Sequence, residues 1–268
     1  MTEQLKKKVD RAIRLLQSIK ADEIELSYSG GKDSDVILEL AKMAGIKYRA
    51  IYKNTTIDPP YTISHCKSRG VEIVRPKISF FNLIRKSGFP TRRARFCCQH
   101  LKEYKILDHS IQGIRRCESV KRAERYKEPI VCRFYGSKNN RVSVALPILE
   151  WTERDVEEFV KERNIQCHPL YYKNGKFDVE ERLGCIGCPL AADKGLADFK
   201  KYPNLVKAWL RAGLDWWNSH PNTASRKKFK DIYELFVHNV FFDSYEEFKL
   251  SVDGGYLERI DCKKFLED

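Results

Sequence analysis

The sequence lacks any run of about 20 apolar residues, the length that a membrane-spanning helix needs. Its first 20 residues also lack the apolar stretch and the small-residue cleavage site of a secretory signal peptide. Apolar residues recur there at helical spacing instead, from Leu5 to Ile19. Because 42% of the 268 residues are nevertheless hydrophobic, we expect a cytoplasmic protein with a substantial core and no membrane partner.

Acidic residues are too few to balance the basic ones. The chain has 37 Asp and Glu against 50 Lys and Arg, which gives a formal net charge of +13. This excess is typical of proteins that bind a polyanion, either nucleic acid or a highly charged nucleotide. A merely solvated basic surface has the same composition, so charge alone leaves the partner open.

Repeats and low-complexity linkers are absent as well. Strand patterns alternate with helix patterns over residues 20–165, which is typical of βαβ units and a mostly parallel sheet. Thr152, followed three residues later by Asp155, marks a helix start, and Gly45 is a typical residue just after a helix end. We predict an α/β, Rossmann-like domain over residues 1–194 and a helical C-terminal extension over residues 195–268, where Trp216 and Trp217 belong either to a core or to a base-stacking surface.

The stretch "SYSGGKDSD" follows the first expected strand and opens the first crossover helix. Glycines there allow a sharp turn, and the helix N-terminus favours an anion. Leu26 and Asp33 exclude a Walker A loop, which needs Gly and Ser or Thr at those positions. Asp33 or Asp35 is a candidate for holding Mg²⁺ or positioning water. The candidate nucleotide ligands of this loop are Ser29, Gly30, Gly31, Lys32, Asp33 and Ser34.

A second basic stretch, "GIRRCESVKRAER", covers residues 113–125. A glycine bend presents two arginines, and a third follows on an expected helix. Guanidinium groups bind phosphate or sulfate oxygens through two parallel hydrogen bonds, whereas a plain basic helix face has the same pattern. The candidate binding residues here are Gly113, Arg115, Arg116, Glu118, Ser119 and Arg122.

Nine cysteines, an odd number, do not fit a fully paired disulfide framework. Cys97 and Cys98 are adjacent, which makes a local bridge difficult, and Cys185 and Cys188 form a C-x-x-C pair. Four thiolates suit either tetrahedral Zn²⁺ or a [4Fe–4S] cluster. Because a cubane offers four separate iron corners, adjacent cysteines favour the cluster. We assign the other five cysteines to packing, and Cys117 is notable because it lies inside the arginine block.

The loop "SGGKDS" resembles the PP-loop of the adenine-nucleotide α-hydrolase superfamily, which includes ATP pyrophosphatases and the phosphoadenosine phosphosulfate (PAPS) reductase family. The stretch "GIRRCESVKRAER" resembles the family's G-x-R-x-x-E-S-x-x-R-A segment. "LPILEWTERDVEEFV" and "HPLYYKNG" resemble a further family block, with His168 in place of the usual Asn. The resemblance covers about residues 20–190. It implies binding of ATP with Mg²⁺, or of a sulfated adenosine, and catalytic roles for Lys32, Asp33, Arg115 and Arg122.

The cysteine pattern "CCQHLK" with "GCIGCP" is similar to the cluster signature of adenylyl-sulfate reductases and of the DNA phosphorothioation proteins DndC and SspD. This resemblance implies a [4Fe–4S] cluster on Cys97, Cys98, Cys185 and Cys188. It also implies sulfur insertion into DNA or tRNA, with a cysteine desulfurase as the sulfur donor. Arg93, Arg95 and Lys102 would offset the negative charge of such a cluster.

The C-terminus lacks the Glu-Cys-Gly-[Leu/Ile]-His segment that carries the catalytic cysteine of assimilatory sulfonucleotide reductases. Cys262 stands between Asp261 and Lys263 instead. We therefore predict a PP-loop ATP pyrophosphatase-type enzyme of sulfur transfer to nucleic acid. Two alternatives remain open: an adenylyl-sulfate or PAPS reductase that uses a thioredoxin-like reductant, and a non-catalytic nucleotide- or nucleic-acid-binding subunit with a structural metal.

Overall fold

The structure, a computed structural model, describes residues 1–104, 106–135 and 141–253. The chain forms two compact units, each built from several segments. The first, called the sheet unit here, comprises Met1–Asn54, Pro59–Arg75 and Glu103–Gly184; the second, called the helical unit, comprises Thr55–Asp58, Pro76–Lys102 and the chain from Cys185 onward. The domain boundary that the sequence predicts between residues 194 and 195 stays a prediction.

The sheet unit is built on a six-stranded sheet with the order β3-β2-β1-β4-β6-β5. Its strands are β1 (Glu25–Tyr28), β2 (Arg49–Lys53), β3 (Glu72–Val74), β4 (His109–Ile111), β5 (Ile130–Phe134) and β6 (Arg141–Ala145). All neighbours are parallel except β5, which runs antiparallel to β6. The expected mostly parallel α/β sheet is therefore confirmed, with the edge strand β5 as an addition that the sequence reading missed.

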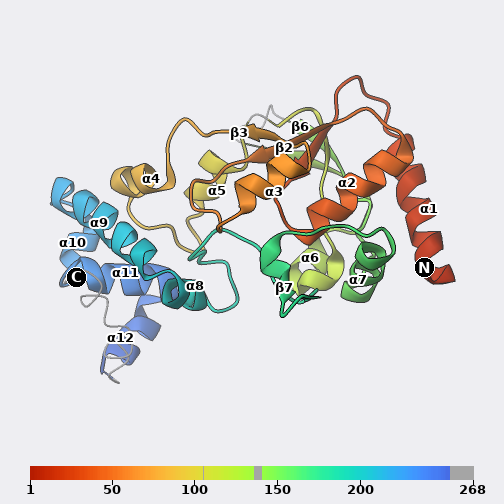
Figure 1. The fold of residues 1–268 in the computed structure, drawn as a ribbon. Helices are drawn as coiled ribbons and strands as arrows, with labels where there is room; N and C mark the ends of the chain where they lie inside the picture. The colour runs from red at the N-terminus through yellow and green to blue at the C-terminus, as the bar shows by residue number, and fades with distance from the viewer. Residues whose placement is uncertain (105, 136–140, 254–268) are drawn as a thin grey trace. The chain divides into compact units, whose positions relative to one another are not determined.

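Helices connect the strands of this unit and flank the sheet (Figure 1). They are α1 (Glu3–Gln17), α2 (Lys32–Ala44), α3 (Thr62–Ser68), α6 (Val120–Arg125) and α7 (Glu153–Glu162), with 3₁₀ turns at Arg116–Glu118 and Pro169–Tyr171 and a small hairpin of β7 (Tyr172–Lys173) and β8 (Lys176–Phe177). The two helix boundaries predicted from the sequence are confirmed. Thr152 and Asp155 form a capping box at the start of α7, and Gly45 ends α2 in the left-handed region.

The core of the sheet unit lies between the sheet and the helices α1, α2 and α7. Leu26 of β1, Leu40 of α2 and Phe159 of α7 are all fully buried in one cluster. The sheet also buries a charge: Glu25 is 1% exposed and pairs with Lys53 at 3.0 Å. A buried carboxylate is tolerated where a cation and hydrogen bonds compensate its lost hydration.

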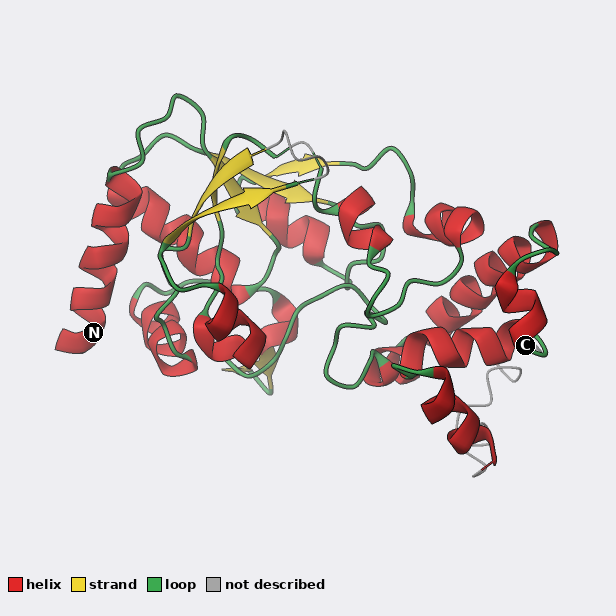
Figure 2. Ribbon diagram, turned by 180° about the vertical axis from the view of Figure 1, so that it is seen from behind, coloured by secondary structure: helices red, strands yellow, loops and turns green. Residues whose placement is uncertain are grey.

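The helical unit contains no strand within its described residues and appears in Figure 2 as a group of red helices. Its helices are α4 (Phe80–Ser87), α5 (Phe96–Leu101), α8 (Leu196–Lys201), α9 (Pro203–Ser219), α10 (Ala224–Lys228), α11 (Ile232–Phe241) and α12 (Tyr245–Asp253). The expected helical C-terminal part is confirmed. No helix among the described residues has both the length and the apolar character needed to cross a bilayer.

Trp209 is the centre of an aromatic core in the helical unit. Its ring lies 4.8 Å from Phe80 and 5.4 Å from Phe199, centroid to centroid. Trp216 and Trp217 are 8% and 6% exposed and belong to the same cluster. They are therefore core residues, and the base-stacking role considered for them from the sequence is wrong.

Gly213 of α9 is required by this packing. A Cβ atom at that position would lie 2.1 Å from the Phe89 ring tip. Alanine usually stabilises a helix by about 1 kcal/mol over glycine, but overpacking a core costs about 1–3 kcal/mol. We expect Gly213→Ala to lower the free energy of unfolding, as measured by urea denaturation. Gly184→Ala, whose Cβ meets nothing within 4 Å, is the control. A Gly213→Ala protein more stable than the original would contradict the packing argument.

Candidate functional site

The candidate nucleotide site lies where the strand order of the sheet reverses. β1 is flanked by β2 on one side and by β4 on the other, both in parallel register. Segments that leave the carboxyl ends of β1 and β4 therefore diverge and leave a crevice between them, which is where open α/β sheets bind their ligands. The loop at residues 29–31 follows β1, and Gln112 and Gly113 follow β4.

The loop after β1 has the backbone of an anion-binding turn. Gly30 has φ +80°, a conformation that strains any residue with a Cβ atom. The hydroxyl of Ser34 donates to the Gly31 carbonyl at 2.6 Å and so ties the first turn of α2 to the loop. Ser29 accepts from the Gly31 amide at 3.4 Å. The loop is thus fixed at the helix N-terminus, whose positive dipole end favours a phosphate.

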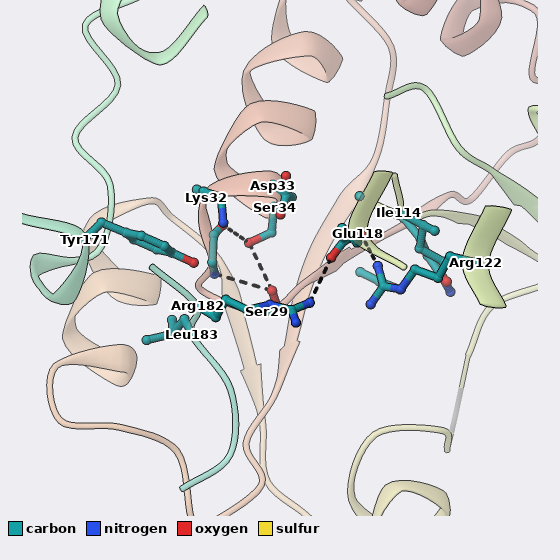
Figure 3. Close-up of a pocket in the computed structure, with 14 residues that line it drawn as sticks. Ser29, Lys32, Asp33, Ser34, Ile114, Glu118, Arg122, Tyr171, Arg182 and Leu183 are labelled. Atoms are coloured by element: carbon teal, nitrogen blue, oxygen red, sulfur yellow. Dashed lines mark hydrogen bonds and ion pairs between the residues drawn. The ribbon is translucent and has the colours of Figure 1, made fainter. Parts of the chain in front are cut away.

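A polar cavity of about 300 Å³ opens at this loop (Figure 3). Residues from the loop, from the segment after β4 and from the chain near residues 171–183 line it together. The lining residues are Ser27, Ser29, Gly31, Lys32, Asp33, Ser34, Gln112, Gly113, Ile114, Glu118, Arg122, Tyr171, Arg182 and Leu183.

Lys32 is the cation nearest the loop and is held in place from two sides. Its ammonium group donates to the Glu181 carbonyl at 3.0 Å and lies 5.2 Å from the centre of the Tyr171 ring. The residue is only 5% exposed. A buried lysine whose position is fixed in this way provides a localised positive charge for phosphate oxygens at little further entropic cost.

Glu118 joins two arginines that line the cavity (Figure 3). Arg122, one turn along the chain, pairs with it closely, and Arg182 lies 3.6 Å from its other oxygen. The Glu118 side chain is only 11% exposed. One carboxylate is therefore shared by two guanidinium groups that line the cavity, and the trio keeps one net positive charge. A bound polyanion offers them more negative charge than Glu118 does.

Asp33 is paired with Arg115, which lies behind the cavity wall. The Arg115 Nε atom is 2.7 Å from Asp33, and its Nη2 atom is 3.2 Å from Glu153. Burial raises the pKa of Asp33 above its ordinary value, although Arg115 and Lys32 act in the opposite direction. Gly113 closes the same corner, because a Cβ there would lie 2.9 Å from the Asp33 carbonyl oxygen. Arg115 is thus a positioning group for Asp33.

Asp35 does not reach the cavity, in contrast to the role considered for it from the sequence. It is fully buried, hydrogen-bonds to the Tyr28 hydroxyl and lies 3.1 Å from His65. The Tyr28 hydroxyl and His65 are themselves 3.0 Å apart. Burial lowers the pKa of the neighbouring His168 to about 4, so that this imidazole is neutral at pH 7. Of the two loop acids, only Asp33 is available to Mg²⁺ or water.

The sequence-predicted nucleotide residues divide into two groups. Most of them line the cavity; Gly30, Arg115, Arg116 and Ser119 do not. Arg116 donates to the Tyr126 carbonyl at 2.7 Å and pairs with Glu150. Ser119 caps α6 by accepting from the Arg122 amide. Their direct contact with a nucleotide stays a prediction. Arg182, Tyr171 and Gln112 line the cavity but were not singled out from the sequence.

The four candidate metal-binding cysteines all belong to the helical unit. Cys97 and Cys98 lie on α5, and Cys185 and Cys188 lie in a loop whose Ile186 amide donates to the Ile57 carbonyl at 2.9 Å. A hydrogen bond with Cys98, burial, and the proximity of Cys98, Cys185 and Cys188 raise the pKa of Cys97 far above its ordinary value. All three partners are therefore near Cys97.

Lys102 adds a positive charge to this set. Its proximity to the Cys185 sulfur, against the opposing effect of burial, raises the pKa of Lys102. Four thiols with an adjacent ammonium group are a chemically suitable donor set for Zn²⁺ or an anionic iron–sulfur cluster. Among the described residues, however, no group of three or more His, Cys, Asp or Glu side chains has the geometry of a metal site. The metal therefore stays a prediction.

Two further cysteines were noted in the sequence. Cys117 is exposed, accepts from Arg115 at 3.0 Å and lies 3.3 Å from Glu153. Burial of its sulfur, with Glu153 adding to the effect and Arg115 opposing it, raises the pKa of Cys117 to about 11. Its thiol is thus protonated at neutral pH and a poor nucleophile. Cys262 lies outside the described residues.

Comparison with protein families identifies the chain. The model of the phosphoadenosine phosphosulfate reductase domain matches residues 23–191. The chain belongs to this family. The match includes the phosphate loop, the arginine block and both cysteine doublets, so that PAPS reductase family membership supports a nucleotide-utilising enzyme.

Two similar proteins are described as uncharacterized. One, from Methanocaldococcus jannaschii, is 30% identical over 202 residues, which cover 70% of this chain and 46% of that protein. The other, a 37.8 kDa protein in the gpa 5′ region of Escherichia phage 186, is 28% identical over 217 residues, covering 70% of this chain and 61% of that protein. The chain thus spans less than two thirds of either relative.

Solved structures resemble this PAPS reductase family member only at the level of the fold. The U34-tRNA thiolase NcsA from Methanococcus maripaludis with its [4Fe–4S] cluster has a TM-score of 0.43 and 14% identity, with 86% of this chain and 84% of that chain covered. The NH₃-dependent NAD synthetase from Campylobacter jejuni has a TM-score of 0.43 and 15% identity, with 86% and 99% covered.

Because Arg182 lines the cavity, its substitution tests whether the cavity binds a nucleotide. A charge-assisted hydrogen bond is worth about 1.5–3 kcal/mol, so that Arg182→Ala should weaken ATP binding about tenfold to a hundredfold. Isothermal titration calorimetry measures this change. Arg154→Ala, which removes an exposed arginine of α7, is the matched control and should bind ATP normally. Equal affinities for the two variants would show that Arg182 does not contact the nucleotide.

Proposed function

We propose that this protein is an ATP-dependent sulfur-transfer enzyme that activates a group on nucleic acid. The observation that carries the proposal is the cavity at the phosphate loop, where Lys32, Arg122 and Arg182 converge around a loop with the PP-loop sequence. Three cations suit a triphosphate better than a single phosphate or sulfate group, because electrostatic attraction grows with the charge of the ligand.

The proposed reaction has two steps. An oxygen atom of the nucleic acid attacks the α-phosphorus of ATP, and the bond to the bridging oxygen breaks as magnesium pyrophosphate leaves. Lys32 and the loop amides stabilise the leaving group, which gains negative charge in this step. The outer sulfur of a persulfide, supplied by a cysteine desulfurase, then attacks the activated atom, and AMP leaves with the former substrate oxygen. A dithiol reductant cleaves the remaining S–S bond with two electrons, becomes a disulfide, and so releases the thiolated product.

Several charged side chains of the cavity also act in the first step. Arg122 and Arg182 exchange Glu118 for phosphate oxygens, which is a bidentate interaction for a guanidinium group. Asp33, oriented by Arg115, accepts the Mg²⁺ ion or the water in its coordination shell. Since Arg115 is only 1% exposed, it keeps Asp33 in one orientation rather than contacting solvent or nucleotide itself.

The cysteine set serves the second step in this proposal. Cys97, Cys98, Cys185 and Cys188 would hold a [4Fe–4S] cluster, which, with one cysteine on each iron, would supply electron transfer. Lys102 offsets part of the negative charge of the four thiolates. The alternative is sulfonucleotide reduction, which family membership favours and which the absence of the Glu-Cys-Gly-[Leu/Ile]-His segment opposes.

Release of pyrophosphate is the direct test. Protein purified without oxygen should release pyrophosphate from ATP, and DNA or tRNA should stimulate the release. Lys32→Ala should lower the rate at least a hundredfold, since removal of one preorganised charge contact of a transition state costs about 2.7–4 kcal/mol. Lys42→Ala, at the exposed end of the same helix, should leave it unchanged. Sulfite release from adenylyl sulfate, with no pyrophosphate from ATP, would favour the reductase instead.

Metal content tests the role of the cysteines independently. The anaerobic protein should be brown and contain about four iron atoms per chain. Cys185→Ser should abolish the colour and lower the iron content, because one cluster ligand is lost. Cys132→Ser, which removes an exposed cysteine of β5, should retain both. A colourless protein with one zinc ion per chain would contradict the cluster and support the alternative of a structural metal.

A further inference from the structure

Residues 76–102 of the helical unit form a segment in which every Lys, Arg, Asp or Glu residue is basic. It contains no Asp or Glu, although acids make up 37 of the 268 residues of the chain. Its seven basic residues are Lys77, Arg85, Lys86, Arg92, Arg93, Arg95 and Lys102. Arg85 pairs with Asp215 at 2.8 Å, and Lys102 lies beside Cys185.

Three of the four arginines of this segment lie in one tight turn, Thr91–Arg95. The Thr91 amide donates to the Ala94 carbonyl at 3.2 Å, and the Ala94 amide donates to the Thr91 hydroxyl at 2.9 Å. These two bonds close the turn and place Arg92 and Arg93 at its tip. All three arginines of the turn are exposed. The guanidinium groups are therefore presented to solvent by a backbone that is already ordered.

Arg92 and Arg93, at the tip of the turn, have no strong ion pair with a described residue. Arg92 lies 4.0 Å from Asp243, with both side chains well exposed, and exposed pairs of this kind contribute only about 0–1 kcal/mol. Arg93 forms no ion pair with any described residue. An external anion can thus bind at the tip of the turn without breaking a strong internal interaction.

The turn leads directly into the helix that carries two of the four cysteines. Arg95 is the residue before α5 (Phe96–Leu101), and Cys97 follows two residues later. Cys97 comes four positions after Arg93 in the chain, so that their Cα atoms lie within about 14 Å of each other. A ligand held by the turn is therefore close to the cysteine set of the same unit.

We infer that the turn Thr91–Arg95 binds the sugar–phosphate backbone of the nucleic-acid substrate and holds that substrate beside the cysteines. The inference rests on the proposed function for the identity of the substrate. Guanidinium groups match phosphate oxygens in geometry and charge, and phosphate contacts position a nucleic acid without reading its sequence. The ligand class is a single-stranded nucleic acid or loop, whose phosphates and reacting group are accessible at the same time.

An acidic protein is the competing ligand, and the surface fits it less well. Protein interfaces combine charge with buried aromatic or aliphatic anchors. None of the large hydrophobic residues that are exposed in the described structure falls within residues 76–102. The exposed residues around the turn are Arg92, Arg93, Ala94, Arg95, Gln99 and His100. A surface of this composition offers charge and hydrogen bonds but no apolar anchor.

The test uses the full-length protein, a fluorescein-labelled single-stranded oligonucleotide and fluorescence anisotropy, without ATP. Arg92→Glu combined with Arg93→Glu should weaken binding at least tenfold. The slope of log affinity against log salt concentration should decrease by about 1.4, since each phosphate contact on a single strand contributes about 0.7. Lys200→Glu combined with Lys201→Glu, on exposed positions of α8, changes the net charge equally and should have little effect.

The outcomes separate this inference from the proposed function. Equal losses for the two double variants would mean that only net charge matters, and the inference would be overturned. It would also be overturned if the arginine variant bound the oligonucleotide normally but lost binding to polyglutamate. If the arginine variant still releases pyrophosphate and binds the oligonucleotide as before, the role of the turn is refuted and the proposed reaction is not. If oligonucleotide binding needs the turn but no pyrophosphate is released, the proposed reaction is refuted and the role of the turn is not.

Circular dichroism checks that the variants fold. The Arg92→Ala, Arg93→Ala protein is a second, milder variant.

Discussion

The buried ion pair of Arg115 and Asp33 is the constraint on which the nucleotide site depends. Arg115 follows β4, Asp33 opens α2, and Glu153 opens α7, so that one guanidinium group fixes three elements of the sheet unit relative to one another. Gly113 makes this approach possible because a side chain there would collide with the Asp33 backbone. The position of the phosphate loop is thus determined by contacts from the opposite side of the switch point, and not by the loop sequence alone.

Most of the sheet unit could be predicted from the sequence because its signals are local. Thr152 with Asp155 starts α7, Gly45 ends α2, and the "SGGKDS" loop lies at the switch point as expected. The edge strand β5 was missed although Ile130–Phe134 is mostly apolar, because this short run lacks the apolar–polar alternation of a half-buried strand and its side chains stay exposed or half-buried at the sheet edge. The helix α5 is only six residues long, too short for a helical period to be recognised in "FCCQHL".

The candidate site could be predicted only in part, for a different reason. The residues of the loop and of the arginine block were found because they form continuous motifs. Arg182 and Tyr171 reach the cavity from irregular segments far along the chain, and no sequence pattern specifies that approach. The burial and the partners of a side chain also restrict what it can contact, and a sequence motif does not show this. Arg115 is enclosed behind Asp33 and Arg116 binds Glu150, although both occur in a stretch that resembles a phosphate-binding motif.

The pairing of Glu118 with two arginines gives the cavity a threshold for its ligands. Any anion that binds there must compete with a carboxylate that is already ordered and largely buried. A ligand with one negative charge gains little by replacing Glu118, whereas a ligand with several charges can satisfy Arg122, Arg182 and Lys32 together. The pairing with Glu118 therefore favours ligands that carry several negative charges over ligands that carry one.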